Sequence, residues 1–143
     1  MGLDDPEKKM SKSAASEKNY LSLMDDETTV LKKLKAAGTD SGSTITFDQK
    51  RAGLANLLTI YSLVAEKTID EIVNQYEGKG YGDFKVELAQ AVSAYLAPLQ
   101  EKIRGYLKDE QKLLMILDQG AARAQTLASK KMDEVRQKIG VKL

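Results

Sequence analysis

Two lysines and two serines near the start of the chain form the grouping best suited to chemistry. They belong to the run Lys9-Met10-Ser11-Lys12-Ser13, called here the KMSKS loop (residues 9–13). Two ammonium groups three positions apart, interleaved with hydroxyls and backbone N–H groups, can surround a polyphosphate. A loop that tightens as charge develops in phosphoryl or nucleotidyl transfer stabilises the transition state more than the ground state, and one such donor contributes about 3 kcal/mol. The pattern predicts a phosphate-binding loop, although Lys- and Ser-rich terminal segments are more commonly solvated tails.

Other catalytic groups are scarce. The chain of 143 residues contains neither Cys nor His, which excludes a disulfide framework, a thiolate nucleophile and a Cys-ligated zinc site, and removes the commonest general base. We predict no metal site. The adjacent carboxylates at positions 4–5, 25–26 and 109–110 are expected to be solvated or to cap helices.

The composition is that of a globular domain without a membrane span. Hydrophobic residues make up 42% and charged residues 30% of the chain, and the formal net charge is +1. No apolar stretch approaches the roughly 20 residues that cross a bilayer. Positive charge collects at one end, because residues 101–143 carry ten Lys and Arg against six Asp and Glu. This excess is a weak sign of a polyanionic partner.

The elements that must position the loop are predicted to be helices. Residues 1–24 are polar and read as a loop and connector, whereas residues 25–143 carry apolar side chains mostly at helical spacing. Asp25 or Asp26 starts the first helix, and Thr68 with Glu71 forms a capping box for a later one. The predicted fold is all-α: an antiparallel helical bundle preceded by an irregular KMSKS loop. The expected helices lie near residues 25–38, 54–64, 68–78, 84–106 through Pro98, and 113–139, with a loop over 39–49.

Two further features have a structural interpretation. The string Gly78-Lys79-Gly80-Tyr81-Gly82 has the wrong spacing for a nucleotide-binding glycine loop and is expected to be a helix end followed by a turn. Tyr61, Tyr95 and Tyr106 lie on apolar stripes and are expected to pack, whereas Tyr81 is expected to be exposed.

Several motifs together resemble one family. The run from Gly2 to Ser13 resembles the KMSKS signature of class I aminoacyl-tRNA synthetases. Three later strings are similar to the C-terminal domain of the bacterial tryptophanyl-tRNA synthetases: Thr39-Asp40-Ser41, residues 56–62, and the run from Gln75 through Tyr-Glu-Gly-Lys-Gly-Tyr-Gly to Lys85. The resemblance covers essentially the whole chain, and the tyrosyl-tRNA synthetases are the nearest relatives to confuse with it.

The resemblance implies roles for the loop. Lys9, Met10, Ser11, Lys12 and Ser13 would form the site for the triphosphate of ATP, which Mg²⁺ would accompany. Lys9 and Lys12 would be catalytic, with Lys12 the principal stabiliser on the pyrophosphate side, and Met10 would anchor the loop. Residues 25–143 would be the C-terminal, anticodon-binding helical domain.

The partners implied are tRNA(Trp), and tryptophan and ATP through a nucleotide-binding domain, in a homodimeric cytoplasmic enzyme. The chain contains no HIGH-type sequence, tryptophan pocket or parallel-sheet pattern, so we expect it to be inactive alone. The candidate tRNA surface is basic but does not lie on one helical face: Lys102, Arg104, Lys108, Lys112, Arg123, Lys130, Lys131, Arg136 and Lys138. Alternatives are a stand-alone helical tRNA-binding module, a relative of tyrosyl-tRNA synthetase, or a purely structural helical protein.

Overall fold

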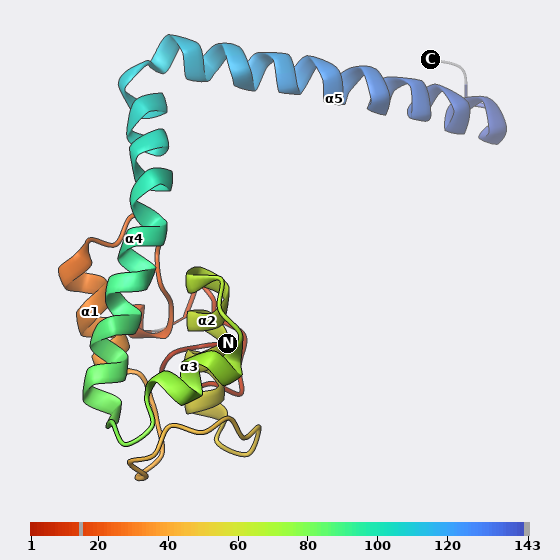
Figure 1. Ribbon diagram of the computed structural model, residues 1–143. Coiled ribbons are helices and arrows are strands. Elements are labelled where there is room, and N and C mark those ends of the chain that lie inside the picture. The colour runs from red at the N-terminus through yellow and green to blue at the C-terminus, as the bar shows by residue number, and fades with distance from the viewer. Residues whose placement is uncertain (15, 142–143) are drawn as a thin grey trace. The chain divides into compact units, whose positions relative to one another are not determined.

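The computed structural model describes residues 1–14 and 16–141, and the regular elements in these ranges are all helical (Figure 1). In chain order they are η1 (Glu17–Asn19), α1 (Glu27–Ala36), α2 (Ala52–Ala65), α3 (Ile69–Gln75), α4 (Tyr81–Lys108) and α5 (Glu110–Ile139). Residues 39–49 contain no helix. The predicted all-α class is confirmed, and α4 runs through Pro98 as the apolar spacing indicated.

The chain divides into two compact units, Met1–Gln100 and Glu101–Leu143. This division does not follow the predicted functional boundary between residues 24 and 25. The first segment belongs to the first unit because Leu3 is buried in its core, and the amide of Leu3 donates to the carbonyl oxygen of Asn19 over 2.8 Å.

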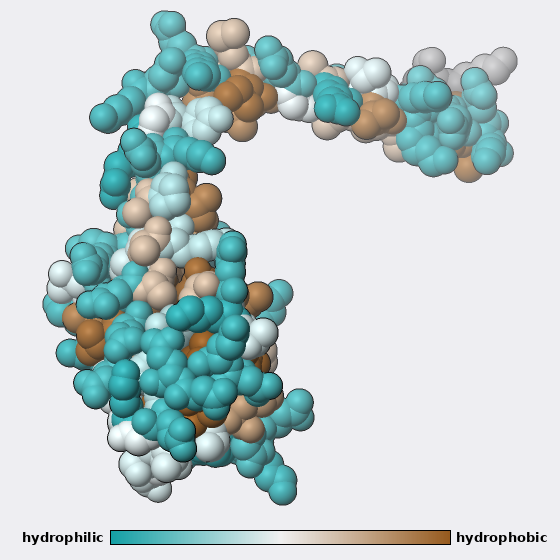
Figure 2. Space-filling view, in the orientation of Figure 1, coloured by the Kyte–Doolittle hydropathy of each residue, from teal (hydrophilic) through white to brown (hydrophobic). Residues whose placement is uncertain are grey.

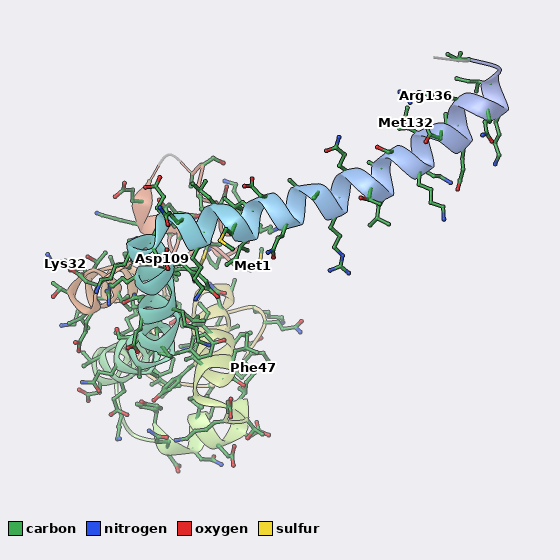
Figure 3. All side chains as sticks on the ribbon, turned by 90° about the horizontal axis from the view of Figure 1, so that it is seen from above. Met1, Lys32, Phe47, Asp109, Met132 and Arg136 are labelled. Atoms are coloured by element: carbon green, nitrogen blue, oxygen red, sulfur yellow. The ribbon has the colours of Figure 1, made fainter. Side chains whose placement is uncertain are left out.

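Local side-chain caps begin three of the described α-helices. The side chain of Asp26 accepts from the amide of Thr29 over 2.7 Å at the start of α1. At α3 the predicted capping box is present, since Thr68 and Glu71 each accept from the other's backbone N–H. Asp109, labelled in Figure 3, caps α5. Such caps satisfy amides that have no partner within the helix and contribute about 1 kcal/mol each.

The hydrophobic core lies in the first unit. Each large apolar side chain buried there contributes about 1.5–3 kcal/mol. Its sixteen members come from α1 to α4 and the segments between and before them: Leu3, Val30, Leu34, Ala37, Ile45, Leu54, Leu57, Leu58, Tyr61, Ile72, Tyr76, Phe84, Leu88, Ala89, Val92 and Leu96.

Helix α5, in the second unit, has no buried residue. Hydrophobic side chains show on its visible surface in Figure 2, and Leu114, Leu117 and Leu127 are more than half exposed. The small side chains Ala121, Ala122, Ala124 and Ala128 that follow Gly120 are also exposed. None of the described helices is long and apolar enough to cross a membrane.

The tyrosine predictions were only partly right. Tyr61 is buried as expected, whereas Tyr95 and Tyr106 are 52% and 46% exposed. Tyr76, which the sequence did not single out, is fully buried and forms an aromatic cluster with Tyr61 and Phe84, with ring centroids 5.2–6.2 Å apart. Edge-to-face and tilted pairs of this kind add to simple burial.

Candidate phosphate-binding site

The KMSKS loop lies on the surface of the first unit with its methionine turned inward. Lys9, Ser11, Lys12 and Ser13 are exposed. Met10 is half-buried and packs against the hydrophobic core. The loop therefore presents charged and hydroxyl groups to solvent from a point fixed by an apolar side chain. Its part in binding ATP stays a prediction.

Hydrogen bonds within the loop bring its two hydroxyls together. The Oγ atoms of Ser11 and Ser13 are 3.0 Å apart, and the amide of Ser13 donates to Ser11 Oγ over 3.3 Å. A turn follows, because the amide of Ala14 donates to the carbonyl oxygen of Ser11 over 3.2 Å. Both hydroxyls have further hydrogen-bonding capacity, so they can serve an anionic ligand as donors.

Among the three neighbouring lysines, one is neutralised locally. Lys8 Nζ lies 2.7 Å from Asp5 Oδ2. Their hydrogen bond lowers the pKa of Asp5 and raises the pKa of Lys8. No carboxylate oxygen of the described residues lies within 4.0 Å of Lys9 or Lys12. These two ammonium groups are the pair that the sequence assigned to a polyphosphate.

Asn19 joins the loop to the rest of the unit, and sequence reasoning did not identify this residue. This residue is only 7% exposed. Its Oδ1 accepts from the amide of Ser11 over 3.3 Å, while its Nδ2 donates to Asp4 Oδ1. A lone Asn in a polar segment looks like ordinary loop composition, since its partners lie 8 and 15 positions away.

The segment before the loop is attached to two helices. The amide of Gly38, just after α1, donates to the carbonyl oxygen of Leu3 over 2.8 Å. Asn56 of α2 donates from Nδ2 to the carbonyl oxygen of Gly2 over 3.2 Å. The amide of Gly2 in turn donates to the carbonyl oxygen of Lys8 over 2.8 Å. The backbone at the base of the loop is thereby held by hydrogen bonds from the backbone and from the Asn56 side chain.

A second polar cluster lies where residues 40–51 meet α4. Arg51 donates from Nε to Asp40 Oδ2 over 2.6 Å and also hydrogen-bonds Tyr81. Tyr81 donates to Asp40 Oδ1 over 2.6 Å. Tyr81 is therefore half-buried, and the prediction that it would be exposed was wrong. The expected turn precedes Tyr81, with Gly78 at φ +76°, whereas Tyr81 and Gly82 already belong to the first turn of α4.

Most partners in this cluster are internal, so its role is structural. The hydrogen bond from Arg51 is the main cause that holds the pKa of Asp40 well below its ordinary value, followed by the bond from Tyr81. The Arg51 guanidinium also donates to the side chain of Thr46 and the carbonyl oxygen of Thr44. The cluster fixes the loop that precedes α2 against the start of α4.

Among the described basic residues of the second unit, Arg136 is half-buried and the others are exposed. Two of them form local ion pairs, between Lys131 and Glu134 at 3.0 Å and between Arg136 and Asp133 at 3.4 Å. Such exposed pairs contribute little stability but reduce the charge available to a partner. The part these residues play in tRNA binding stays a prediction. The described residues include no group of three or more Asp and Glu placed to hold a metal ion.

Comparison with known proteins identifies a family over most of the chain. The profile of the family described as "tRNA synthetases class I (W and Y)" matches residues 1–97. A tryptophan–tRNA ligase of Listeria monocytogenes is 46% identical over 142 residues, and that of Bacillus subtilis is 43% identical over the same length. The chain spans about 43% of the length of these curated relatives.

Solved structures are similar over the same extent. The chain matches the tryptophanyl-tRNA synthetase of Mycoplasma pneumoniae with a TM-score of 0.83 and 29% identity, covering 99% of this chain and 43% of that one. It matches the tryptophanyl-tRNA synthetase of Campylobacter jejuni, in complex with ADP and tryptophan, with a TM-score of 0.70 and 33% identity. That match covers 98% of this chain and 43% of the other.

Proposed function

The chain belongs to the family of class I tRNA synthetases for tryptophan and tyrosine, and from this premise we propose that it supplies the ATP-phosphate loop and the tRNA-binding helices of a tryptophan–tRNA ligase. The observation that carries the proposal is the KMSKS loop itself, in which Lys9 and Lys12 are exposed, have no carboxylate partner among the described residues, and flank a methionine packed against the core. The curated relatives support tryptophan rather than tyrosine as the amino acid.

In the activation step, the carboxylate of tryptophan attacks the α-phosphorus of ATP. A bond forms between that oxygen and phosphorus, and the bond to the bridging oxygen breaks, so pyrophosphate leaves with the electron pair. Lys12 and Lys9 stabilise the charge that grows on the pyrophosphate side, and the hydroxyls of Ser11 and Ser13 donate hydrogen bonds to phosphate oxygens. When bound with the ATP, Mg²⁺ would offset part of the charge on the phosphates.

The second step transfers the tryptophanyl group to tRNA(Trp) and releases AMP. The helices after residue 24, as the C-terminal domain, contact the anticodon region, and the basic residues of the second unit supply contacts to phosphates. The enzyme acts as a cytoplasmic homodimer. The tRNA assignment is supported by the names of the relatives and by the excess of positive charge after residue 100, whereas the homodimer and the cytoplasmic location follow from the family resemblance of the sequence.

The activation proposal is tested by joining this chain to the N-terminal part of the Bacillus subtilis enzyme. The chain alone is expected to give no tryptophan-dependent ATP–pyrophosphate exchange, because a phosphate loop cannot orient the reacting groups by itself. The joined protein is expected to be active. In it, Lys12→Ala should lower kcat about 100-fold.

Lys8→Ala is the matched control, since Lys8 is already paired with Asp5. It should change kcat by less than about twofold. Equal losses in the two variants, or exchange by the chain alone, would contradict the proposed division of roles.

The tRNA proposal is tested by titrating the chain with tRNA(Trp) and with an anticodon variant of it. Tighter binding of the unaltered tRNA is expected, because base contacts specify while phosphate contacts only position. Equal affinity that falls steeply with salt would leave nonspecific attraction as the whole effect.

A further inference from the structure

We propose that Asn19 is a positioning residue that sets the resting conformation of the KMSKS loop, and this inference rests on the proposed phosphate-binding function of that loop. Asn19 touches no reacting atom. It acts through Ser11, whose backbone amide donates to Asn19 Oδ1 over 3.3 Å.

The position of the anchored amide decides what the loop offers to a ligand. Ser11 lies between Met10, which packs inward, and Lys12, which is exposed. Because Asn19 binds the amide of Ser11 from the protein side, that N–H is not directed at an incoming phosphate. The phosphate therefore meets the two lysines and the hydroxyls, while the backbone at the centre of the loop stays fixed.

The orientation of the Asn19 amide is itself determined. Nδ2 donates to the carboxylate of Asp4, which can only accept when ionised, so Oδ1 must face Ser11. The backbone carbonyl oxygen of Asn19 also accepts from the amide of Leu3. One residue thus joins the segment before the loop, the loop itself and the 3-10 helix η1.

Gly2 leaves the space that this arrangement requires. A Cβ added at Gly2 would overlap Asn19 Nδ2 and lie 2.8 Å from the carbonyl oxygen of Asp5. Any side chain at position 2 would displace the Asn19 amide or the Asp5 backbone. The Gly2 contact and the Asp4 contact are independent observations that point to the same function for Asn19.

The direct test compares Asn19→Ala with the parent 143-residue chain by amide hydrogen exchange and by titration with tripolyphosphate, followed at the amides of residues 9–13. Loss of the acceptor is expected to speed exchange at Ser11 at least about tenfold and to weaken tripolyphosphate binding about fivefold to tenfold. Asn74→Ala removes an exposed amide elsewhere in the unit and should change neither quantity.

An exchange of partners separates positioning from general stability. Asn19→Asp alone places two carboxylates together. It should speed amide exchange at Ser11 and weaken the binding of tripolyphosphate. In the double variant Asp4→Asn with Asn19→Asp, the new Asp can accept from Ser11 and from the new Asn. The exchange rate at Ser11 and the affinity for tripolyphosphate should then return to within about twofold of the parent.

The two levels of the proposal fail in different ways. Unchanged Ser11 exchange in Asn19→Ala, or no recovery in a folded double variant, overturns the positioning role of Asn19. A parent chain whose residues 9–13 do not respond to tripolyphosphate overturns the proposed function of the loop, whatever Ser11 exchange shows.

Discussion

Lys85 Nζ lies 2.8 Å from the carbonyl oxygen of Ala37, so a lysine of α4 closes the end of α1. Its side chain is 92% removed from solvent, and the ammonium also reaches Thr39 Oγ1 at 3.3 Å. Burial lowers the pKa of Lys85. A cation at this place satisfies carbonyls that the helix leaves without partners and interacts favourably with the helix dipole.

Lys85→Met is therefore expected to destabilise the first unit, because it keeps the apolar stem and removes the charged donor to these oxygens. The expected loss is about 1–3 kcal/mol in the free energy of unfolding, measured with urea. Lys32→Met, on the exposed face of α1, is the matched control and should stay within about 0.5 kcal/mol of the parent. Similar losses at both positions would show that the ammonium of Lys85 has no special role.

Two glycines are expected to respond to alanine with opposite signs. At Gly53 in α2, a Cβ would overlap the carbonyl oxygen of Gly38, so Gly53→Ala should cost about 1–3 kcal/mol despite the better helix propensity of alanine. At Gly120 in α5, a Cβ meets nothing within 4 Å. Gly120→Ala should therefore stabilise its helix by about 0.5–1 kcal/mol.

Circular dichroism at 222 nm during thermal unfolding measures both glycine effects. The prediction concerns the difference in sign. A Gly53→Ala variant as stable as the parent would mean that the two backbones separate easily. A Gly120→Ala variant with reduced helical signal would indicate that α5 needs the glycine for a contact.

Acid should weaken the cluster that joins residues 40–51 to α4. Hydrogen bonds from Arg51 and Tyr81 lower the pKa of Asp40 below its ordinary value of 3.8. The unfolded chain therefore takes up this proton first as the pH falls. The stability that Asp40 contributes is fully present above pH 3.8 and is lost progressively below it.

Asp40→Asn should consequently lose less stability than the parent on acidification, as measured by urea midpoints at neutral pH and in the acid range below 3.8. Asp118→Asn, a change on exposed α5, should keep the acid dependence of the parent. An Asp40→Asn variant with the full acid dependence would place the acid-sensitive groups elsewhere.

Sequence reasoning worked where the deciding contacts are local. Thr68 was identified as a cap, and Asp26 as one of two candidates with Asp25, because each side chain accepts from the amide three positions further along. Asn19 and Arg51 were not, because each acts on partners set by the fold, up to 30 positions distant for Arg51 with Tyr81. The KMSKS loop was found because its residues form one short motif, whereas the residue that anchors it gives no local signal.

The tyrosines also show the limit of sequence reasoning. Helical spacing places Val92, Tyr95 and Tyr106 of α4 on one apolar stripe, but it does not say where the packing partners end. Burial stops at Leu96, and Tyr106 is exposed. Tyr76 was missed because it follows α3 and reaches the core through the turn.

Tyr76 supplies the last prediction, on alkaline stability. Burial raises its pKa, as does its hydrogen bond to Glu87 Oε2 at 2.6 Å, so the folded protein keeps a proton that the unfolded chain releases near the ordinary value of 10.0. Its contribution is thus fully present below pH 10.0 and declines as the pH rises further. Tyr76→Phe should cost about 1–3 kcal/mol at neutral pH and flatten the alkaline loss. Urea unfolding at neutral pH and above pH 10.0 measures the loss of stability, with Tyr95→Phe on the exposed face of α4 as control. If the free energy of unfolding fell equally with rising pH in the two variants, deprotonation of Tyr76 would not be the cause of the alkaline loss.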